Sequence, residues 1–212
     1  MSEQPFNLEP TDLPDPPDVP GIVNVLGSAD EAIDLLLADM LEAADRVVEE
    51  RGRFDLVVSG DRQLESVWLR MMLDPDLRTF PWHATHLWFS DASGAAEDAV
   101  ESVHARLQES LILPSGLEAD HVHPISNAPT ESIASIRADL GEQPFDAAML
   151  AIAADGGVIE CLPTVVIERL TLLGILVIGQ GGAEGLKALE QNSDQTSDCL
   201  GRCQDGLRWY IG

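Results

Sequence analysis

Short apolar runs alternate with helical patterns along most of the chain. The first run, IVNVL at residues 22–26, has the β-branched character of a buried strand. Ser28 follows with Glu31 three residues later, which is the spacing of a capping box at a helix start. Apolar residues at helical spacing then continue to about Arg51, so the sequence predicts a strand followed by a long helix.

The same alternation repeats over the rest of the chain. Further strands are expected at 54–60, 85–91, 121–125, 146–157, 175–182 and 207–211, and further helices at 63–73, 95–113, 130–141, 163–174 and 183–191. Strands that are separated by helices of this length pair in parallel through right-handed crossovers. The pattern therefore predicts an α/β protein with three layers, α/β/α, around a mostly parallel, Rossmann-like sheet of about six or seven strands.

Residues 1–21 differ from the rest, because they contain six prolines and several acidic residues without periodicity. Such a composition is typical of a flexible or extended arm. We expect residues 22–212 to form a single domain, which is long enough to bury a core without disulfides or metals.

The chain is strongly acidic, with 37 Asp and Glu residues against 12 Lys and Arg and a formal net charge of −25. This charge repels nucleic acid and anionic membranes, so neither is an expected partner. No apolar stretch is long enough to span a bilayer and no basic leader precedes one, which favours a soluble cytoplasmic protein. The three cysteines are too few for a disulfide framework, and we expect them to be reduced.

Histidine and cysteine give no complete metal site in the sequence. Cys199 and Cys203 would need further ligands to hold zinc. His121 and His123 share one side of an expected strand, but no third ligand is evident in register with them. His86 lies near the start of its strand, the wrong end for a site in this fold class. We therefore expect no metal and no cofactor.

In parallel α/β sheets, ligands bind beyond the carboxyl ends of the strands, so the strand ends deserve comparison. Four strand ends stand out: SGDRQ at 59–63, SDAS at 90–93, LAIAADGGVIECLP at 150–163 and IGQGGAEGLKAL at 178–189. In order and spacing, these segments resemble the motifs of the 6-phosphogluconolactonase family, relatives of the glucosamine-6-phosphate deaminases. The family motifs read S-G-G-S-T-P, G-D-E-R, L-G-M-G-x-D-G-H-T-A-S-L-F-P and G-E-G-K. The likeness covers about 22–211.

The resemblance implies a protein of sugar-phosphate metabolism, in the pentose phosphate pathway, that hydrolyses 6-phosphogluconolactone to 6-phosphogluconate. Among the residues at strand ends, Asp155 and Asp91 are the best candidates for an acid–base pair, although aspartates at strand ends also serve as caps and turn formers. The substrate-binding residues that the motifs imply are Ser59, Gly60, Arg62, Gly156, Gly157, Gly179 and Gly181.

The departures from the family pattern bear on activity. Gly157 stands where the D-G-H motif has its proposed general base, and a positioned base supplies about 10²–10⁴-fold in rate. Asp61 replaces a glycine of the phosphate turn, which would cost on the order of 4 kcal/mol beside a phosphate, unless Arg62 compensates. After Pro163 the chain lacks the family's long loop, so a lid over the site is missing.

Three hypotheses remain. The first is a lactone hydrolase that uses Asp155, Asp91 and water, with Arg62 on the phosphate. The second is a catalytically inactive relative that binds a sugar phosphate or similar metabolite, or acts through a protein partner that the acidic arm contacts. The third is an isomerase or deaminase of the same superfamily.

Overall fold

The computed structural model describes residues 13, 15–59, 62–90, 104–125, 129–152, 166, 170–191 and 206–212. Seven strands pair in parallel in one sheet: β1 (Ile22–Val25), β2 (Phe54–Ser59), β3 (Thr85–Ser90), β4 (Val122–Ile125), β5 (Phe145–Ala151), β6 (Leu170–Val177) and β7 (Leu207–Ile211). The larger helices are α1 (Ala29–Arg51), α2 (Glu65–Leu73), α5 (Pro129–Leu140) and α7 (Gly179–Gln191). The predicted α/β architecture is confirmed.

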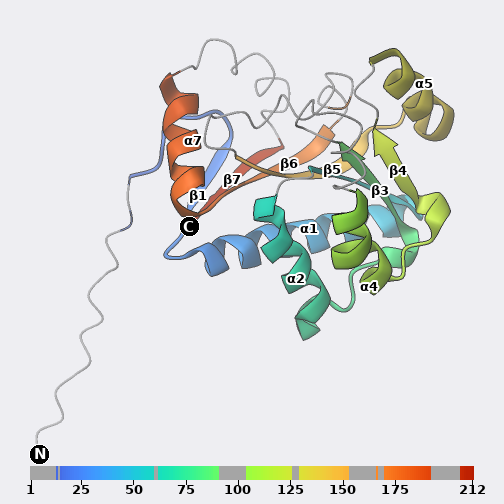
Figure 1. Ribbon diagram of the computed structural model, residues 1–212, viewed down its shortest axis with the longest axis horizontal. Coiled ribbons are helices and arrows are strands. Elements are labelled where there is room, and N and C mark those ends of the chain that lie inside the picture. The colour runs from blue at the N-terminus through green and yellow to red at the C-terminus, as the bar shows by residue number, and fades with distance from the viewer. Residues whose placement is uncertain are drawn as a thin grey trace, which may run out of the picture.

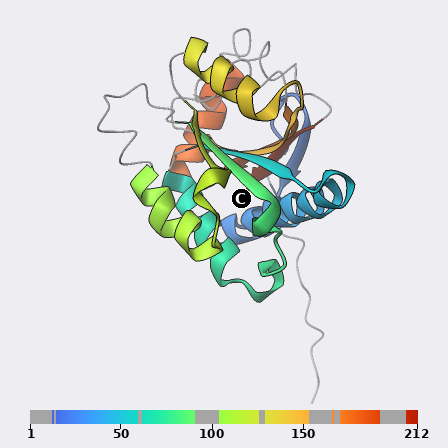
Figure 2. The same ribbon diagram turned by 90° about the vertical axis from the view of Figure 1, so that its right-hand side faces the viewer.

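Helices cover both faces of the sheet (Figures 1 and 2). On one face lie α1, α2 and a helical stretch at 104–115, which includes the π-helical η4 (Gln108–Ile112) and ends in α4 (Leu113–Ser115). The other face carries α5 and α7. Each face has its own apolar core, so alternate residues of the central strands are buried in opposite layers.

The strand order is β1-β7-β6-β5-β2-β3-β4. From β2 the chain winds outward through β3 to β4, then returns to place β5 on the other side of β2 and winds outward again through β6 and β7. The order reverses between β2 and β5, which makes this the topological switch point of the sheet. β2 and β5 are buried along their whole length.

The long first helix begins and ends where the sequence predicts. Ser28 Oγ accepts a hydrogen bond from the Glu31 N–H at 3.2 Å, and Glu31 Oε2 accepts one from the Gly27 N–H at 2.9 Å. Gly52, with φ of 72°, closes the other end in the left-handed conformation that glycine adopts at little cost. This capping fixes where α1 starts to cross beneath the sheet.

Two expectations for the last third of the chain are wrong. The helix expected over 163–174 does not extend to 174, because Leu170 already begins strand β6. The strand expected over 175–182 ends at Val177, and Gly179 begins α7. The first error comes from the apolar run of β6, most of which is buried and whose periodicity does not distinguish helix from strand. The second comes from the glycines after Val177, which begin a helix although glycine is a weak helix former.

The end of the proline-rich segment contacts the domain. The Trp209 Nε1–H donates a 2.7 Å hydrogen bond to the Pro20 carbonyl, and Val19 packs against the core on the α5 and α7 face. Residues 1–12 lie outside the described part of the chain. The expectation of an extended arm therefore stays a prediction for those residues.

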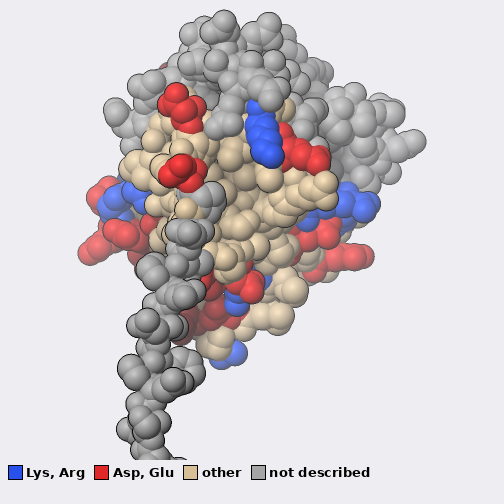
Figure 3. All heavy atoms as spheres, turned by 90° about the vertical axis from the view of Figure 1, so that its left-hand side faces the viewer, with Lys and Arg blue, Asp and Glu red and all other residues tan. Residues whose placement is uncertain are grey.

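Charged side chains of both signs are visible on the face that carries α7 and β1 (Figure 3). On the side of α7 and β1, acidic side chains lie at several separate places, with basic ones near some of them, around a mostly uncharged centre (Figure 3). Within the described residues, none of the helices combines the length and the apolar character that a membrane crossing requires.

Candidate functional site at the switch point

The carboxyl ends of β2 and β5 lie next to each other at the switch point, where α/β proteins bind ligands. Val58 of β2 is level with Met149 of β5, so the two strands end close together. The predicted phosphate turn continues from the first strand, and the D-G-G segment continues from the second. The fold therefore brings together the ends of the two strands from which these sequence motifs continue.

Gln63 connects the two segments directly. It lies in the short helix η1 (Arg62–Leu64) that follows β2, and its Nε2 donates a 2.9 Å hydrogen bond to the Ile152 carbonyl. Ile152 follows β5 and stands three residues before Asp155 in the sequence. The sequence did not predict this contact of Gln63, although its place in SGDRQ was the available signal.

Ser59 ends β2 beside Ser90 of β3 and is 1% exposed. Its Oγ forms no hydrogen bond within the described part of the chain. Buried hydroxyl groups are rarely without a partner. This hydroxyl is therefore a polar group at the switch point that the described scaffold itself does not satisfy.

Arg62 is exposed at the start of η1 and makes no ion pair with any residue that the structure describes. Pairing with Asp61 is an alternative for this guanidinium, but Asp61 falls outside the described residues. Arg62 lies one turn beyond the end of β2, at the same edge of the sheet as Ser59. A guanidinium in that place suits a phosphate or carboxylate ligand.

The β6 to α7 junction offers backbone donors at the same edge. Gly179 has φ of 66°, and a side chain at Gly181 would meet open space. The first N–H groups of a helix lack intrahelical partners and attract anions. At Gly182, where the family has lysine, an added Cβ would lie 3.2 Å from the Val177 carbonyl carbon, so this position packs closely against β6.

The remaining predicted site residues lie outside the described part of the chain. They are Gly60, Asp91, Asp155, Gly156 and Gly157. The described residues Ser59, Arg62, Gly179 and Gly181 all lie at the carboxyl edge, with β5 between the strands that carry them. Whether these residues bind substrate or catalyse a reaction stays a prediction.

The strand order defines a parallel α/β protein with a candidate ligand site at its topological switch point. The chain belongs to the family described as glucosamine-6-phosphate isomerases/6-phosphogluconolactonase, whose model matches residues 27–159. No curated protein sequence matches the chain significantly. The family assignment that the motifs suggested is therefore confirmed.

Solved structures share the fold at low sequence identity. A 6-phosphogluconolactonase from Thermotoga maritima superposes with a TM-score of 0.68 at 16% identity, covering 91% of this chain and 99% of that one. The 6-phosphogluconolactonase from Trypanosoma cruzi gives 0.70 at 13% identity, covering 90% and 94%. A monomeric glucosamine-6-phosphate deaminase gives 0.68 at 11% identity, covering 89% and 96%. These likenesses establish the architecture of the whole domain.

Proposed function

We propose that the protein binds a sugar phosphate at the switch point and has lost most of the lactone hydrolysis of its family. The observation that carries this proposal is Gly157, which stands where the family's D-G-H motif has histidine. Membership of the family supports the ligand class, because the similar solved structures include 6-phosphogluconolactonases and a glucosamine-6-phosphate deaminase. Glycine has no side chain with which to activate water.

The phosphate of the ligand would lie between the end of β2 and the start of α7. Arg62 would supply a guanidinium and the first turn of α7 would supply backbone N–H groups. Asp61 opposes this arrangement through its charge. We therefore expect binding that is weaker than in relatives with a glycine at this position.

The first test measures hydrolysis of 6-phosphogluconolactone, corrected for the spontaneous reaction. The wild-type chain should give little acceleration, and Gly157→His should raise the rate by about 10²-fold or more, because it restores an imidazole in the family position. Gly156→Ala, next to it, controls for a general effect of substitution in this segment.

Wild-type turnover as fast as that of an ordinary enzyme, at about 10 s⁻¹, would refute the loss of activity. It would favour the hydrolase that uses Asp155 and Asp91. Turnover of glucosamine 6-phosphate would instead favour the isomerase or deaminase hypothesis.

The second test measures binding of 6-phosphogluconate by calorimetry. Arg62→Ala should weaken binding by about 10-fold or more, since it removes a charged partner of the phosphate. Arg78→Ala makes the same charge change at an exposed residue ahead of β3, at the opposite edge of the sheet, and should leave binding nearly unchanged. Equal losses in both variants would indicate only long-range attraction and would contradict a local phosphate site.

A further inference from the structure

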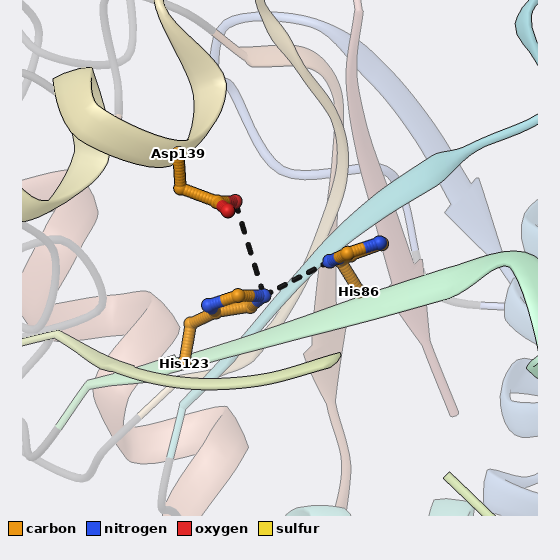
Figure 4. A group of neighbouring side chains, drawn as sticks. All are labelled: His86, His123 and Asp139. Carbon is orange, nitrogen blue, oxygen red and sulfur yellow. Dashed lines mark hydrogen bonds and ion pairs between the residues drawn. The ribbon is translucent and has the colours of Figure 1, made fainter. Parts of the chain in front are cut away.

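A second polar cluster lies at the opposite edge of the sheet, where β3 and β4 begin. His86 is the second residue of β3, and His123 is the second residue of β4. Asp139 comes from the last turn of α5, which passes over these strands (Figure 4). Four residues of strand separate His86 from the end of β3, so the cluster is about 13 Å from the switch-point edge.

The three side chains converge on one another. His86 Nδ1 lies 2.9 Å from His123 Nε2, and His123 Nε2 lies 3.9 Å from Asp139 Oδ2 (Figure 4). One ligand atom from each of the three residues lies within 4.8 Å of the other two. Two nitrogen ligands of a tetrahedral zinc ion are about 3.3 Å apart. Binding the ion therefore needs the two rings to separate slightly and to turn their facing nitrogens toward it, which breaks the hydrogen bond between them.

Ring stacking holds the two imidazoles in these orientations. The ring of His123 stacks on Trp88 with centroids 4.2 Å apart and planes 19° apart. His121 stacks on the ring of His86 at 4.1 Å. Side chains whose rotamers are fixed by packing form a metal site at a lower entropic cost than mobile ones. Access is also present, because the side chains of His123 and Asp139 are 17% and 36% exposed.

The charges around the cluster sum to a negative value when the histidines are neutral. Arg53 pairs with Asp55 through two hydrogen bonds of 2.9 and 2.7 Å and reaches Asp139 Oδ2 at 2.6 Å. Asp55 also accepts the Trp88 Nε1–H at 2.8 Å, so its two oxygens are already occupied. One cation and two carboxylates leave a charge of −1, which a divalent cation more than balances. Asp139 Oδ2 is the oxygen that Arg53 binds, and its Oδ1, which accepts no hydrogen bond from another described residue, is the oxygen offered to that cation.

In the metal-free protein the two rings share a single hydrogen bond between their facing nitrogens. A metal that binds both nitrogens replaces this bond. The ring that donates it has to change to its other tautomer, so that each facing nitrogen presents a lone pair to the metal.

We propose that His86, His123 and Asp139 form a binding site for a divalent transition metal of the zinc class, separate from the sugar-phosphate site. Two imidazoles and one carboxylate are the three protein ligands of many zinc sites that keep a further position for water. Imidazole ligands favour zinc, copper and nickel over magnesium and calcium. The site joins the start of β4 to the end of α5, so the bound metal ties an edge strand to its covering helix.

The test is a calorimetric titration of the full chain, first freed of metal, with Zn²⁺ in a buffer of high ionic strength that screens the acidic surface. We expect one Zn²⁺ per chain. His123→Ala and Asp139→Asn should each lower the affinity by at least about 10-fold. His104→Ala removes an exposed histidine from the opposite face and should leave the affinity unchanged. All titrations are repeated with Cys199→Ser and Cys203→Ser, since thiols also bind zinc.

Asp139→Asn guards against misfolding as the cause of a loss, because this side chain is partly exposed on a helix and changes by one atom. Far-ultraviolet circular dichroism of each variant checks the fold. Zn²⁺ titration should also shift the imidazole signals of His86 and His123 in the nuclear magnetic resonance spectrum and leave those of His104 in place. Binding that survives both substitutions, or that disappears with the cysteines, would overturn the proposal.

Discussion

Asp146 is a carboxylate buried within the sheet, with 5% of its surface exposed. It forms an ion pair with Arg51 at the end of α1, and its Oδ2 accepts the Asp55 N–H at 2.8 Å. Burial raises its pKa to about 6, the charge of Asp55 adds to the rise, and the bonds from Arg51 and from the Asp55 N–H oppose it. The folded protein therefore holds this proton more tightly than the unfolded chain does.

This shift gives a prediction for stability against pH. The contribution of Asp146 is fully present below about pH 4 and is lost as the pH rises through 6, because the folded pKa lies above the ordinary value of 3.8. The free energy of unfolding of wild type minus that of Asp146→Asn should fall by roughly 2 kcal/mol between pH 4 and pH 7.

Urea denaturation at several pH values measures this difference. Asp45→Asn, at an exposed carboxylate on α1, controls for the change in net charge. If the difference in unfolding free energy between wild type and Asp146→Asn stayed constant with pH, the buried carboxylate would not titrate in this range.

At the scale of single residues, the sequence predicted where candidate residues lie along the chain but not which side chains contact one another. The end of β2 at Ser59 was found from an apolar run and a family motif, whereas Gly179 was expected in a strand and instead begins α7. The pairing of His121 with His123 on one strand was wrong, because His121 ends the turn η5 (Ala119–His121) before β4 begins. The real neighbour of His123 is His86, on another strand, and the sequence has no short-range signal for such a contact.

At the scale of elements, the packing of β6 on α1 depends on Gly174. A Cβ added there would lie 2.6 Å from Leu36 Cδ1 and 2.9 Å from Met40 Cε, both on α1. The absence of a side chain thus lets the long helix approach the centre of the sheet. The same glycine made the first half of β6 harder to predict as a strand, because glycine is uncommon in strand interiors and the residues around it are uniformly apolar.

Gly174→Ala should lower the free energy of unfolding by about 1–3 kcal/mol, because the added methyl group overpacks this contact. Gly181→Ala in α7 adds the same methyl group where nothing lies within 4 Å, and should be neutral or stabilising by up to about 1 kcal/mol. Urea denaturation followed by circular dichroism measures both. Wild-type stability in Gly174→Ala would show that α1 can move aside.

At the scale of the whole molecule, strand and helix alternation was enough to predict a three-layer α/β fold. It could not give the strand order, because the return of β5 to the side of β2 depends on contacts between residues far apart in the chain. That return creates the switch point and aligns the two motifs that Gln63 connects. The resemblance to the family motifs indicated the fold of the whole sheet, which local periodicity alone could not give.

The position of β1 has a consequence for the order in which the protein is made. β1 pairs with β7, so Ile22 cannot pair until Arg208, its partner in register, has been synthesised 186 residues later. At about 5–20 residues per second this takes roughly 10–40 s on the ribosome. Until then the hydrogen-bonding edge of β1 has no partner strand, and an unpaired strand edge is a site at which incomplete chains can aggregate.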